Sequence, residues 1–357
     1  MGWTVVGQDD AIRVLSAAAR GERLAHAYLF TGPAHVGKTM TAMQFAQALN
    51  CTAGDPPCGR CRQCERVASG MHADVEIIDR TAMCEDKDHK PGEHKSDNSR
   101  DIRICQILRV GRLSHNPPFE GAYRVWIIDP ADAMNEPSSN ALLKTLEEPP
   151  PNVVFVLVTD REEMLLPTIR SRTRRIEFQG VPKSVIEQTL RTRWDAEPPR
   201  AAELAGLSGG RLGWALIALR DAEMLTQHRE LLDRAEAMAG APLAERFAFG
   251  GQLGGKYTKD RAGVQATLAA WQEWWRDVLL IAGGREQQAM HRDRLDRLRP
   301  LAAQCGVGPA VRALRAITDA RQQLEENASP VLALEAMMLA LPALRLNAVA
   351  GRLAAQD

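Results

Sequence analysis

Eight residues near the beginning of the chain have the types and the spacing of a phosphate-binding loop. Residues 32–39 read Gly-Pro-Ala-His-Val-Gly-Lys-Thr, an intact G-x-x-x-x-G-K-S/T pattern. In such a loop the backbone N–H groups converge on phosphate oxygens, Lys38 reaches the β- and γ-phosphates, and the Thr39 hydroxyl holds Mg²⁺. The pattern predicts that the protein binds a nucleotide. It does not by itself predict that the nucleotide is hydrolysed.

A carboxylate stands where a P-loop protein needs a further contact to magnesium. Asp129 ends the apolar run of residues 124–128 and is followed by Pro130. In hydrolysing members of many such families a glutamate at this next position polarises the attacking water, whereas proline has no carboxylate. Because the loss of a positioned base slows a reaction by about 10²–10⁴-fold, we expect weak or absent ATPase activity. Asp132 is two residues beyond Pro130. Two interpretations of Asp129 stay open, namely that it helps to bind Mg²⁺ or that it only ends the strand.

Four cysteines behind the loop have the spacing of a metal site. Cys51, Cys58, Cys61 and Cys64 form a C-x6-C-x2-C-x2-C pattern. Four thiolates favour Zn²⁺ in a tetrahedral site, and a closed site of this kind has no open position for a substrate. We therefore expect a structural zinc ion. Two alternatives stay open, namely four unligated thiols and an iron–sulfur cluster.

These residues need strands and helices that hold them in place. The loop follows the apolar run 27–30 and precedes a helical stretch at 40–49, which is the strand–loop–helix context that the pattern requires. Further apolar runs at 75–79, 124–129 and 153–159 predict strands, and helical periods at 1–25, 104–113 and 138–148 alternate with them. This alternation predicts a parallel sheet covered by helices on both faces.

The pattern changes after about residue 178. Short helical stretches occupy 182–219, and beyond 241 the sequence has a helical period throughout, with no further strand predicted. We therefore predict an α/β P-loop domain at 1–178 with its cysteine module at 51–64, a small helical domain at 179–240 and a larger helical domain at 241–357. Residues 84–100 are polar and charged, which predicts a mobile insertion.

Composition limits the class of protein further. The chain has 357 residues, with 45 Lys and Arg against 45 Asp and Glu, so its formal net charge is zero. This balance argues against binding of nucleic acid through an overall positive charge, although not against a local basic face. No signal segment begins the chain and no apolar run approaches about 18 residues, so we expect a cytoplasmic protein with no membrane partner. In that compartment seven cysteines indicate metal binding or free thiols rather than disulfides.

Several motifs, taken in their order along the chain, resemble those of bacterial DNA polymerase III clamp-loader ATPase subunits. They are Val6-Gly7-Gln8, the run from His26 to Pro33 that leads into the P-loop, the inserted cysteine module, Asn140-Ala-Leu-Leu-Lys-Thr-Leu-Glu-Glu-Pro149, Leu165-Leu-Pro-Thr-Ile-Arg-Ser-Arg172, and residues 327–342. Thr173 departs from this pattern, because a cysteine is usual there. The resemblance spans nearly the whole chain and implies an AAA+ fold. That fold is an α/β P-loop domain with a parallel sheet, then a helical lid domain and an all-α collar domain for oligomerisation.

Two subunit types of this family share the motifs. Pro130, the short chain and the segment 208–215 resemble the delta' subunit, whereas the intact P-loop is a departure from many delta' subunits and is typical of the gamma/tau motor subunit. The resemblance implies an ATP-dependent pentamer with gamma/tau and delta subunits, which loads the sliding clamp onto primed DNA. A delta'-like chain would lend an arginine to a neighbour, and a gamma/tau-like chain would hydrolyse ATP itself. A third alternative is an unrelated P-loop helicase or remodelling enzyme, against which residues 327–342 argue.

The resemblance also implies roles for single residues. Arg172 would be an arginine finger that reaches the ATP of a neighbouring subunit, since planar guanidinium donors suit developing phosphate charge. Thr159 would sense the γ-phosphate, and Arg211 would be the sensor of the lid. The plainer alternatives are a surface arginine, a β-branched strand residue and a solvated arginine at a helix start. The nucleotide-binding set implied is Val6, Gln8, Gly32, Gly37, Lys38, Thr39, Met40, Asp129, Thr159 and Arg211, with Thr39 and Asp129 binding magnesium.

Two groups of residues in the helical half have plainer interpretations. Trp271, Trp274 and Trp275 fall on helical spacing, which favours a core or a subunit interface over stacking on bases. Four arginines between positions 292 and 299 alternate with aspartates, which is typical of a solvated face of mixed charge.

Overall fold

The computed structural model describes residues 2–84, 101–326 and 328–344. The insertion predicted at 84–100 lies outside this range except for Cys84, as does Asn327, the first residue of the last motif. Two compact units divide the chain. One consists of Met1–Asp195 with Gly210–Trp214, and the other of Ala196–Gly209 with Ala215–Asp357. The division predicted at residues 178 and 240 stays a prediction.

A five-stranded parallel sheet forms the centre of the first unit. Its order is β2-β3-β4-β1-β5, and every neighbouring pair is parallel. The strands are β1 (Ala27–Thr31), β2 (Val75–Ile78), β3 (Arg124–Ile128), β4 (Val153–Val158) and β5 (Arg174–Glu177). Because the strands run in one direction, β1, β3 and β4 all end at the same edge of the sheet. The loops that follow these ends are therefore neighbours.

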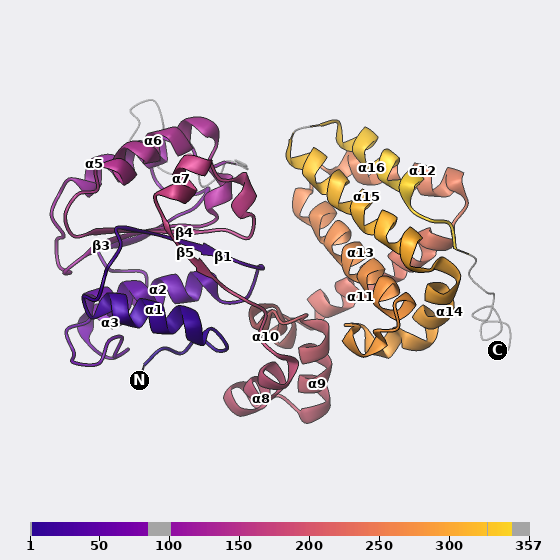
Figure 1. Cartoon of the computed structure of the whole chain (residues 1–357), viewed down its shortest axis with the longest axis horizontal. Helices are drawn as coiled ribbons and strands as arrows, with labels where there is room; N and C mark the ends of the chain where they lie inside the picture. The colour runs from indigo at the N-terminus through magenta and orange to yellow at the C-terminus, as the bar shows by residue number, and fades with distance from the viewer. Residues whose placement is uncertain (1, 85–100, 327, 345–357) are drawn as a thin grey trace. The chain divides into compact units, whose positions relative to one another are not determined.

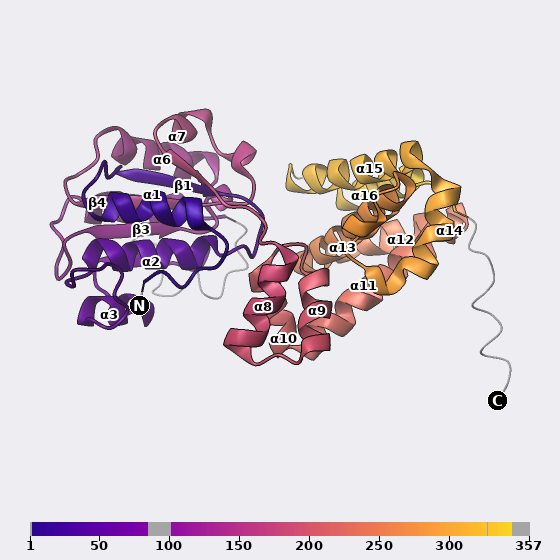
Figure 2. The same cartoon turned by 60° about the horizontal axis from the view of Figure 1, so that its bottom comes forward.

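Helices cover both faces of this sheet, as Figures 1 and 2 show. Tyr28 and Phe30 of β1 pack in a core with α1 (Asp9–Ala19), α2 (Lys38–Asn50) and α3 (Arg62–Ala68). Ala27 and Leu29 point to the opposite face and pack with α5 (Ile104–Ser114), α6 (Glu136–Glu147) and α7 (Pro167–Ser171). This alternation follows from the two-residue period of a strand. The unit also contains α8 (Lys183–Trp194) and the short 3-10 helices η1 (Ala131–Ala133) and η2 (Glu162–Met164). The parallel sheet predicted from the sequence is confirmed.

Three elements differ from the prediction. The helix predicted across 1–25 is limited to α1, because Gly7 has a φ of +73° and the helix begins only at Asp9. Helix α3 is extra, and it begins inside the cysteine module at a turn where the Cys61 sulfur accepts the backbone N–H of Cys64. Strand β5 is also extra. It is a charged edge strand in which only Ile176 is buried, so it lacks the apolar alternation that would have indicated it.

A buried carboxylate ties the loop before β3 to the body of the first unit. The Asp74 side chain accepts the backbone N–H groups of Phe119, Glu120 and Gly121 at 2.7–2.9 Å, and it pairs with the Arg124 guanidinium at 2.9 Å. Burial alone would raise the pKa of Asp74, but these hydrogen bonds outweigh it and hold the pKa below its ordinary value.

The second unit is entirely helical in the residues described. Its elements are α9 (Pro198–Leu207), most of α10 (Leu212–Arg220), α11 (Ala222–Gly240), α12 (Leu243–Lys256), α13 (Arg261–Ala282), η3 (Glu286–Gln288), η4 (Arg292–Arg294), α14 (Leu295–Cys305), α15 (Val307–Glu325) and α16 (Pro330–Ala340). Trp271, Trp274 and Trp275 are no more than 1% exposed and lie in its core, so their interpretation as core residues is confirmed. None of the helices in the described parts of the chain is both long and apolar enough to cross a lipid bilayer.

The solvated face predicted between residues 292 and 299 is wrong for one arginine. Arg294 is buried, where it pairs with Asp233 at 2.6 Å and donates to the carbonyl oxygen of Arg229 at 3.1 Å. Arg297 and Arg299 are about half exposed and pair with carboxylates, as expected of a mixed-charge face.

Replacing Asp74 with alanine is expected to destabilise the first unit by about 3–5 kcal/mol, because it leaves the largely buried Arg124 guanidinium without its counter-charge. Because the native pKa of Asp74 lies below the unfolded value of about 3.9, its stabilisation is full above that pH. The stabilisation is lost as the pH falls through the native pKa. Urea unfolding, with hydrogen exchange at residues 119–121, measures both effects. Asp10→Ala, at a side chain that is 92% exposed, is the matched control and should change the free energy of unfolding by less than about 0.5 kcal/mol. Equal losses in the two variants would contradict this role of Asp74.

Candidate functional site

The P-loop lies at the sheet edge where the strands end. It leaves β1 at Thr31 and enters α2 at Lys38. Gly32 has a φ of +133°, and a Cβ atom at this position would lie 2.2 Å from the Phe178 carbonyl oxygen, so only glycine fits. Gly37 has a φ of +100° and precedes the helix in a left-handed conformation. The two glycines of the motif therefore sit where the backbone geometry requires them.

The side chain of Lys38 is folded back onto the loop. Its Nζ donates to the carbonyl oxygens of Gly32 at 2.7 Å and Pro33 at 2.6 Å, and the residue is 7% exposed. Burial lowers the pKa of Lys38, and the charges of three nearby carboxylates oppose that shift; these are Asp160, Asp129 and Asp132. A buried ammonium group whose hydrogen bonds go to carbonyl oxygens is suited to exchange them for phosphate oxygens.

Thr39 and Asp129 meet, although 90 residues separate them in sequence. The Thr39 hydroxyl donates to Asp129 Oδ2 at 2.5 Å. Burial raises the pKa of Asp129, while this hydrogen bond and the charge of Lys38 oppose the shift. Hydroxyl and carboxylate oxygens are ligands that Mg²⁺ prefers. A bound magnesium ion would also offset the unfavourable burial of the carboxylate, so the residues present fit the ion.

Asp132, the next carboxylate after the position of the missing glutamate, already accepts hydrogen bonds from its neighbours. Asp132 is 2% exposed, and its Oδ1 accepts the Thr159 hydroxyl at 2.7 Å. Its Oδ2 accepts Arg161 Nε at 3.0 Å and also the Arg161 terminal nitrogen. A carboxylate with both oxygens occupied is poorly placed to polarise a water molecule. Thr159 is 1% exposed and lies beside β1, where its N–H donates to the Phe30 carbonyl oxygen.

The start of α10 contacts the outer part of the P-loop within the first unit. The Gly213 N–H donates to the His35 carbonyl oxygen at 2.8 Å, and a Cβ atom on Gly213 would lie 2.8 Å from the same oxygen. Arg211 lies just before this helix, with its guanidinium carbon 5.8 Å from the centre of the Trp214 ring. The structure thus brings the segment that contains Arg211 to the P-loop, as the prediction for this residue requires.

The remaining predicted nucleotide contacts lie around the loop in different ways. Gln8 is buried, and its side-chain amide donates to the carbonyl oxygens of Gln179 at 2.7 Å and Val36 at 3.3 Å. Its amide therefore positions the loop, and contact with adenine would fall to its backbone. Val6 is partly buried, and Met40 is 55% exposed. Their contacts to a nucleotide stay predictions.

Arg172 lies away from the chain's own P-loop. It follows α7, pairs with Glu147 of α6 at 2.8 Å and is 36% exposed. β5 begins two residues later and pairs in parallel register with β1, with Tyr28 opposite Arg174 and Thr31 opposite Glu177. Arg172 is therefore at the edge where strands begin, whereas the P-loop is at the edge where they end. At about 3.3 Å per residue, the length of β5 separates them by 10 Å or more.

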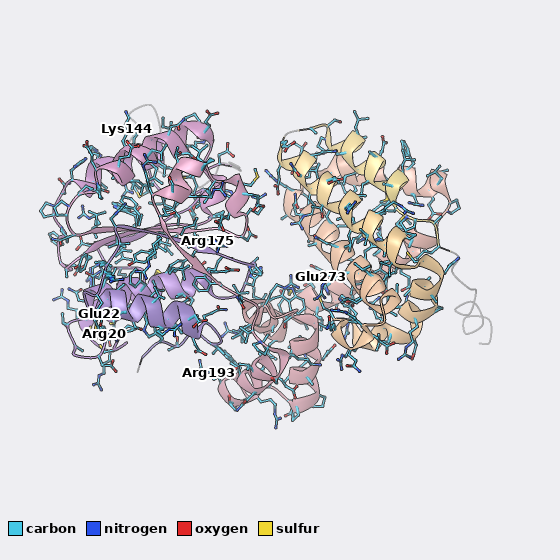
Figure 3. All side chains as sticks on the ribbon, in the orientation of Figure 1. Arg20, Glu22, Lys144, Arg175, Arg193 and Glu273 are labelled. Atoms are coloured by element: carbon cyan, nitrogen blue, oxygen red, sulfur yellow. The ribbon has the colours of Figure 1, made fainter. Side chains whose placement is uncertain are left out.

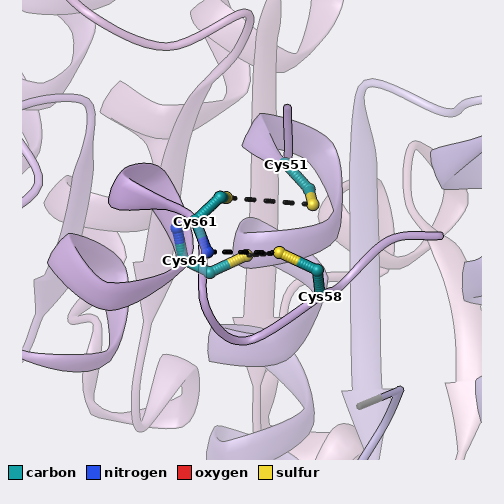
Figure 4. A group of neighbouring side chains, drawn as sticks. All are labelled: Cys51, Cys58, Cys61 and Cys64. Carbon is teal, nitrogen blue, oxygen red and sulfur yellow. Dashed lines mark hydrogen bonds between the residues drawn. The ribbon is translucent and has the colours of Figure 1, made fainter. Parts of the chain in front are cut away.

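The four predicted metal ligands converge, as Figure 4 shows. The sulfur atoms of Cys51, Cys58, Cys61 and Cys64 all lie within 4.8 Å of one another. Those of Cys58 and Cys64 are 3.9 Å apart, and those of Cys51 and Cys61 are 4.0 Å apart. With Zn–S bonds of about 2.3 Å, a tetrahedral site places its sulfur atoms about 3.8 Å apart. The four cysteines could therefore hold a metal ion with little movement.

The ionisation of these thiols is uneven. Burial opposes ionisation of Cys61, but backbone N–H groups, chiefly that of Cys64, outweigh it and lower the pKa of Cys61 to about 6. Burial raises the pKa of Cys64, and the neighbouring sulfur atoms add to that rise. Thiolates crowded together need a cation to ionise together, and a divalent metal supplies one. Gln47 anchors the module to α2 by donating to the Cys64 carbonyl oxygen at 2.8 Å.

Three residues of the site had no signal in the sequence analysis. Arg161 forms an ion pair with Asp132, Asp160 lies near Lys38, and the Gly213 N–H donates to the His35 carbonyl oxygen. Asp160 and Arg161 directly follow the predicted sensor Thr159, so the end of that strand is the one pattern that could have indicated them. Gly213 was part of the segment 208–215, but its contact depends on the path of the chain between α8 and α10.

The fold and the site together define a P-loop α/β unit followed by a helical unit. A family model described as "DNA polymerase III, delta subunit" matches residues 7–182. The DNA polymerase III subunit delta' of Bacillus subtilis (strain 168) is 26% identical over 335 residues, which cover 94% of this chain and 96% of that protein. The gamma/tau subunit of Mycobacterium tuberculosis (strain ATCC 25618 / H37Rv) is 34% identical over 188 residues, 52% of this chain. The chain therefore belongs to the clamp-loader subunits of DNA polymerase III.

The relatives differ in how much of their own length is matched. The chain spans only 30% of the mycobacterial gamma/tau subunit, whereas it spans nearly all of the Bacillus delta' subunit. Among solved structures, a gamma subunit-related protein of DNA polymerase III from Thermotoga maritima MSB8 is similar, with a TM-score of 0.39 and 16% identity. That alignment covers 91% of this chain and 97% of the other.

Cys64→Ala is expected to weaken the absorption that thiolate-to-metal charge transfer gives when cobalt(II) replaces zinc, because it removes one of four converging thiolates. Cys305→Ala is the matched control, since both cysteines are buried but Cys305 lies outside the cluster. Titration of the zinc-stripped chain with cobalt(II) makes the comparison. Equal charge-transfer bands in the two variants would rule out a four-thiolate site.

Proposed function

We propose that this chain is a delta'-type clamp-loader subunit. It assembles with gamma/tau and delta subunits in the cytoplasm, in a complex that loads the sliding clamp onto primed DNA with ATP. Its own P-loop binds Mg²⁺ and ATP with little hydrolysis, and Arg172 serves the ATP of a neighbouring subunit. Residues 1–178, 179–240 and 241–357 act as the nucleotide-binding, lid and collar domains.

The engagement of Asp132 is the observation that carries this proposal. Pro130 replaces the expected catalytic glutamate, and the next carboxylate along the chain already accepts hydrogen bonds from Thr159 and Arg161. A site that holds a nucleotide but does not activate water suits a subunit that stabilises an assembly rather than drives it. The match over almost the full length of the Bacillus delta' subunit supports the same choice.

The placement of Arg172 supports an action on a second subunit. The residue lies at the sheet edge opposite the chain's own P-loop, and its guanidinium pairs with the half-exposed Glu147 and donates to the Thr168 carbonyl oxygen at 3.1 Å. An exposed ion pair of this kind contributes little stability and is easily exchanged for a stronger partner. A phosphate of a nucleotide on an adjacent subunit is such a partner.

The bound groups that we propose have separate roles. A zinc ion held by Cys51, Cys58, Cys61 and Cys64 would be structural, since all of its positions are filled. Magnesium would lie against Thr39 and Asp129, and it would neutralise phosphate charge when a nucleotide is bound. Lys38 and the backbone N–H groups of the loop would hold and orient the phosphates.

A gamma/tau-type motor subunit is the second candidate. The observation that favours it is the complete P-loop, with Lys38 buried and Thr39 in contact with Asp129. The higher identity to the tau subunit of Bacillus subtilis, 34% over 201 residues, points the same way. This candidate requires the chain to hydrolyse its own ATP.

Arg172→Ala is expected to lower the ATPase rate of the reconstituted clamp loader. The loss should equal the contribution of the one ATP site that Arg172 serves, because an arginine finger accelerates hydrolysis at its site by about 10³–10⁵-fold. The subunits should still assemble, since the exposed pair with Glu147 contributes little stability. Arg170→Ala, two residues away and exposed, is the matched control and should leave the ATPase unchanged. Steady-state turnover with clamp and primed DNA, beside gel filtration of the complex, measures both.

Two results would contradict the proposal. Unchanged turnover in an assembled Arg172→Ala complex would remove the arginine-finger role. Failure of the wild-type chain to enter a complex with gamma/tau and delta subunits would remove the clamp-loader function itself.

A further inference from the structure

Three side chains of the metal-binding kind meet inside the helical unit, and the nucleotide site uses none of them. They are His228 on α11, Glu273 on α13 and His291, which lies between η3 and η4. One ligand atom from each lies within 4.8 Å of those of the other two. Their side chains are 12%, 14% and 0% exposed. Figure 3 labels Glu273 on its helix.

Asp277 fixes the orientation of His291. The Asp277 carboxylate is fully buried, and its Oδ2 lies 2.7 Å from His291 Nδ1. The same carboxylate accepts the backbone N–H groups of Met290 at 3.0 Å and of His291 at 2.8 Å. With two backbone donors already present, the ring completes the set by donating from Nδ1. Its Nε2 then carries the lone pair, which is the form in which histidine binds a metal.

His291 Nε2 is buried and has no hydrogen-bond partner. A buried acceptor without a donor from the protein is uncommon in native proteins and calls for an explanation. The opposite ring nitrogen is held by a carboxylate, which is the arrangement that orients most histidine ligands of metals. A cation beside Nε2 would satisfy the lone pair.

His228 and Glu273 are spaced like two ligands of one ion. His228 Nε2 and Glu273 Oε2 are 3.5 Å apart. With bonds of about 2.0–2.2 Å, a tetrahedral ion places its nitrogen and oxygen ligands about 3.3–3.6 Å apart. The imidazole rings of His228 and His291 stack with centroids 5.8 Å apart, so the His291 ring lies next to the His228 ring.

We propose that His228, Glu273 and His291 form a second metal site, which takes a divalent transition-metal ion, with zinc as its occupant. Two imidazoles and one carboxylate are a ligand set typical of Zn²⁺, with a fourth position left for water. Asp277 is the positioning residue of the site. A hydrogen-bonded network without metal would pair His228 with Glu273, but it would leave His291 Nε2 unsatisfied.

The site would have a structural role. Its ligands come from α11, from α13 and from the segment that follows α13, so one ion would fasten three parts of the helical unit. The residues are nearly enclosed, which suits an ion that holds helices together better than one that meets a substrate. The cysteine cluster belongs to the other unit, so the two ions would be bound independently.

The test is the zinc content of the full-length chain after equilibration with zinc and desalting. The wild type is expected to hold two ions per chain, and His228→Gln and Glu273→Gln are expected to hold one. The matched controls, His115→Gln and Glu245→Gln, replace exposed residues of the same types and should hold two. Competition with a chromophoric chelator should show the second ion weakened by at least about 10–100-fold in the ligand variants.

Cobalt(II) identifies the ligands independently of these variants. In the wild type, cobalt(II) bound at the second site should add the absorption of nitrogen and oxygen ligands without adding to the thiolate charge-transfer band. One ion in the wild type, or an unchanged second ion in Glu273→Gln, would overturn the proposal. If circular dichroism shows that both ligand variants lose helix, the number of zinc ions bound by the wild-type chain tests the proposal by itself. Two ions support the proposal, and one ion overturns it.

Discussion

The contact between the Thr39 hydroxyl and the Asp129 carboxylate is the interaction on which the first unit depends. It joins the P-loop after β1 to the end of β3, and β4 lies between these strands in the sheet. The contact forms only if all three strands keep their register, because a slip of one residue would turn every side chain to the other face. The left-handed conformations of Gly32 and Gly37 then bring the loop back over the strand ends. The same strand register therefore determines both the packing of the core and the geometry of the P-loop.

In the function that we propose, the two edges of the same sheet separate nucleotide binding from catalytic assistance. At the edge where strands end, Lys38 and Thr39 are placed to hold a nucleotide, while Asp132 is bound by its neighbours and Pro130 offers no base. At the edge where strands begin, Arg172 is partly exposed beside Glu147. A chain built in this way is suited to hold one nucleotide and to act on another. The proposed division would require an assembly of several subunits.

Local patterns allowed much of this to be predicted from the sequence. The P-loop and the cysteine spacing are short motifs whose residues determine their own geometry, and the buried strands are marked by their apolar residues. Strand β5 could not be predicted, since it is charged and depends on pairing with β1. The engagement of Asp132 by Arg161 depends on the order of the strands, and the cluster around His291 depends on the packing of distant helices. Contacts of this kind become visible only in three dimensions.

Nucleotide binding and turnover, measured together on the isolated chain, test the central claim most directly. Titration with a fluorescent ATP analogue and Mg²⁺ should saturate, and the saturation should be lost in Lys38→Ala. Steady-state hydrolysis of ATP by the same wild-type sample should stay at the background rate of Lys38→Ala. Robust turnover that disappears in Lys38→Ala would contradict the account and identify the chain as a motor. Absence of saturation up to millimolar nucleotide would contradict the binding site itself.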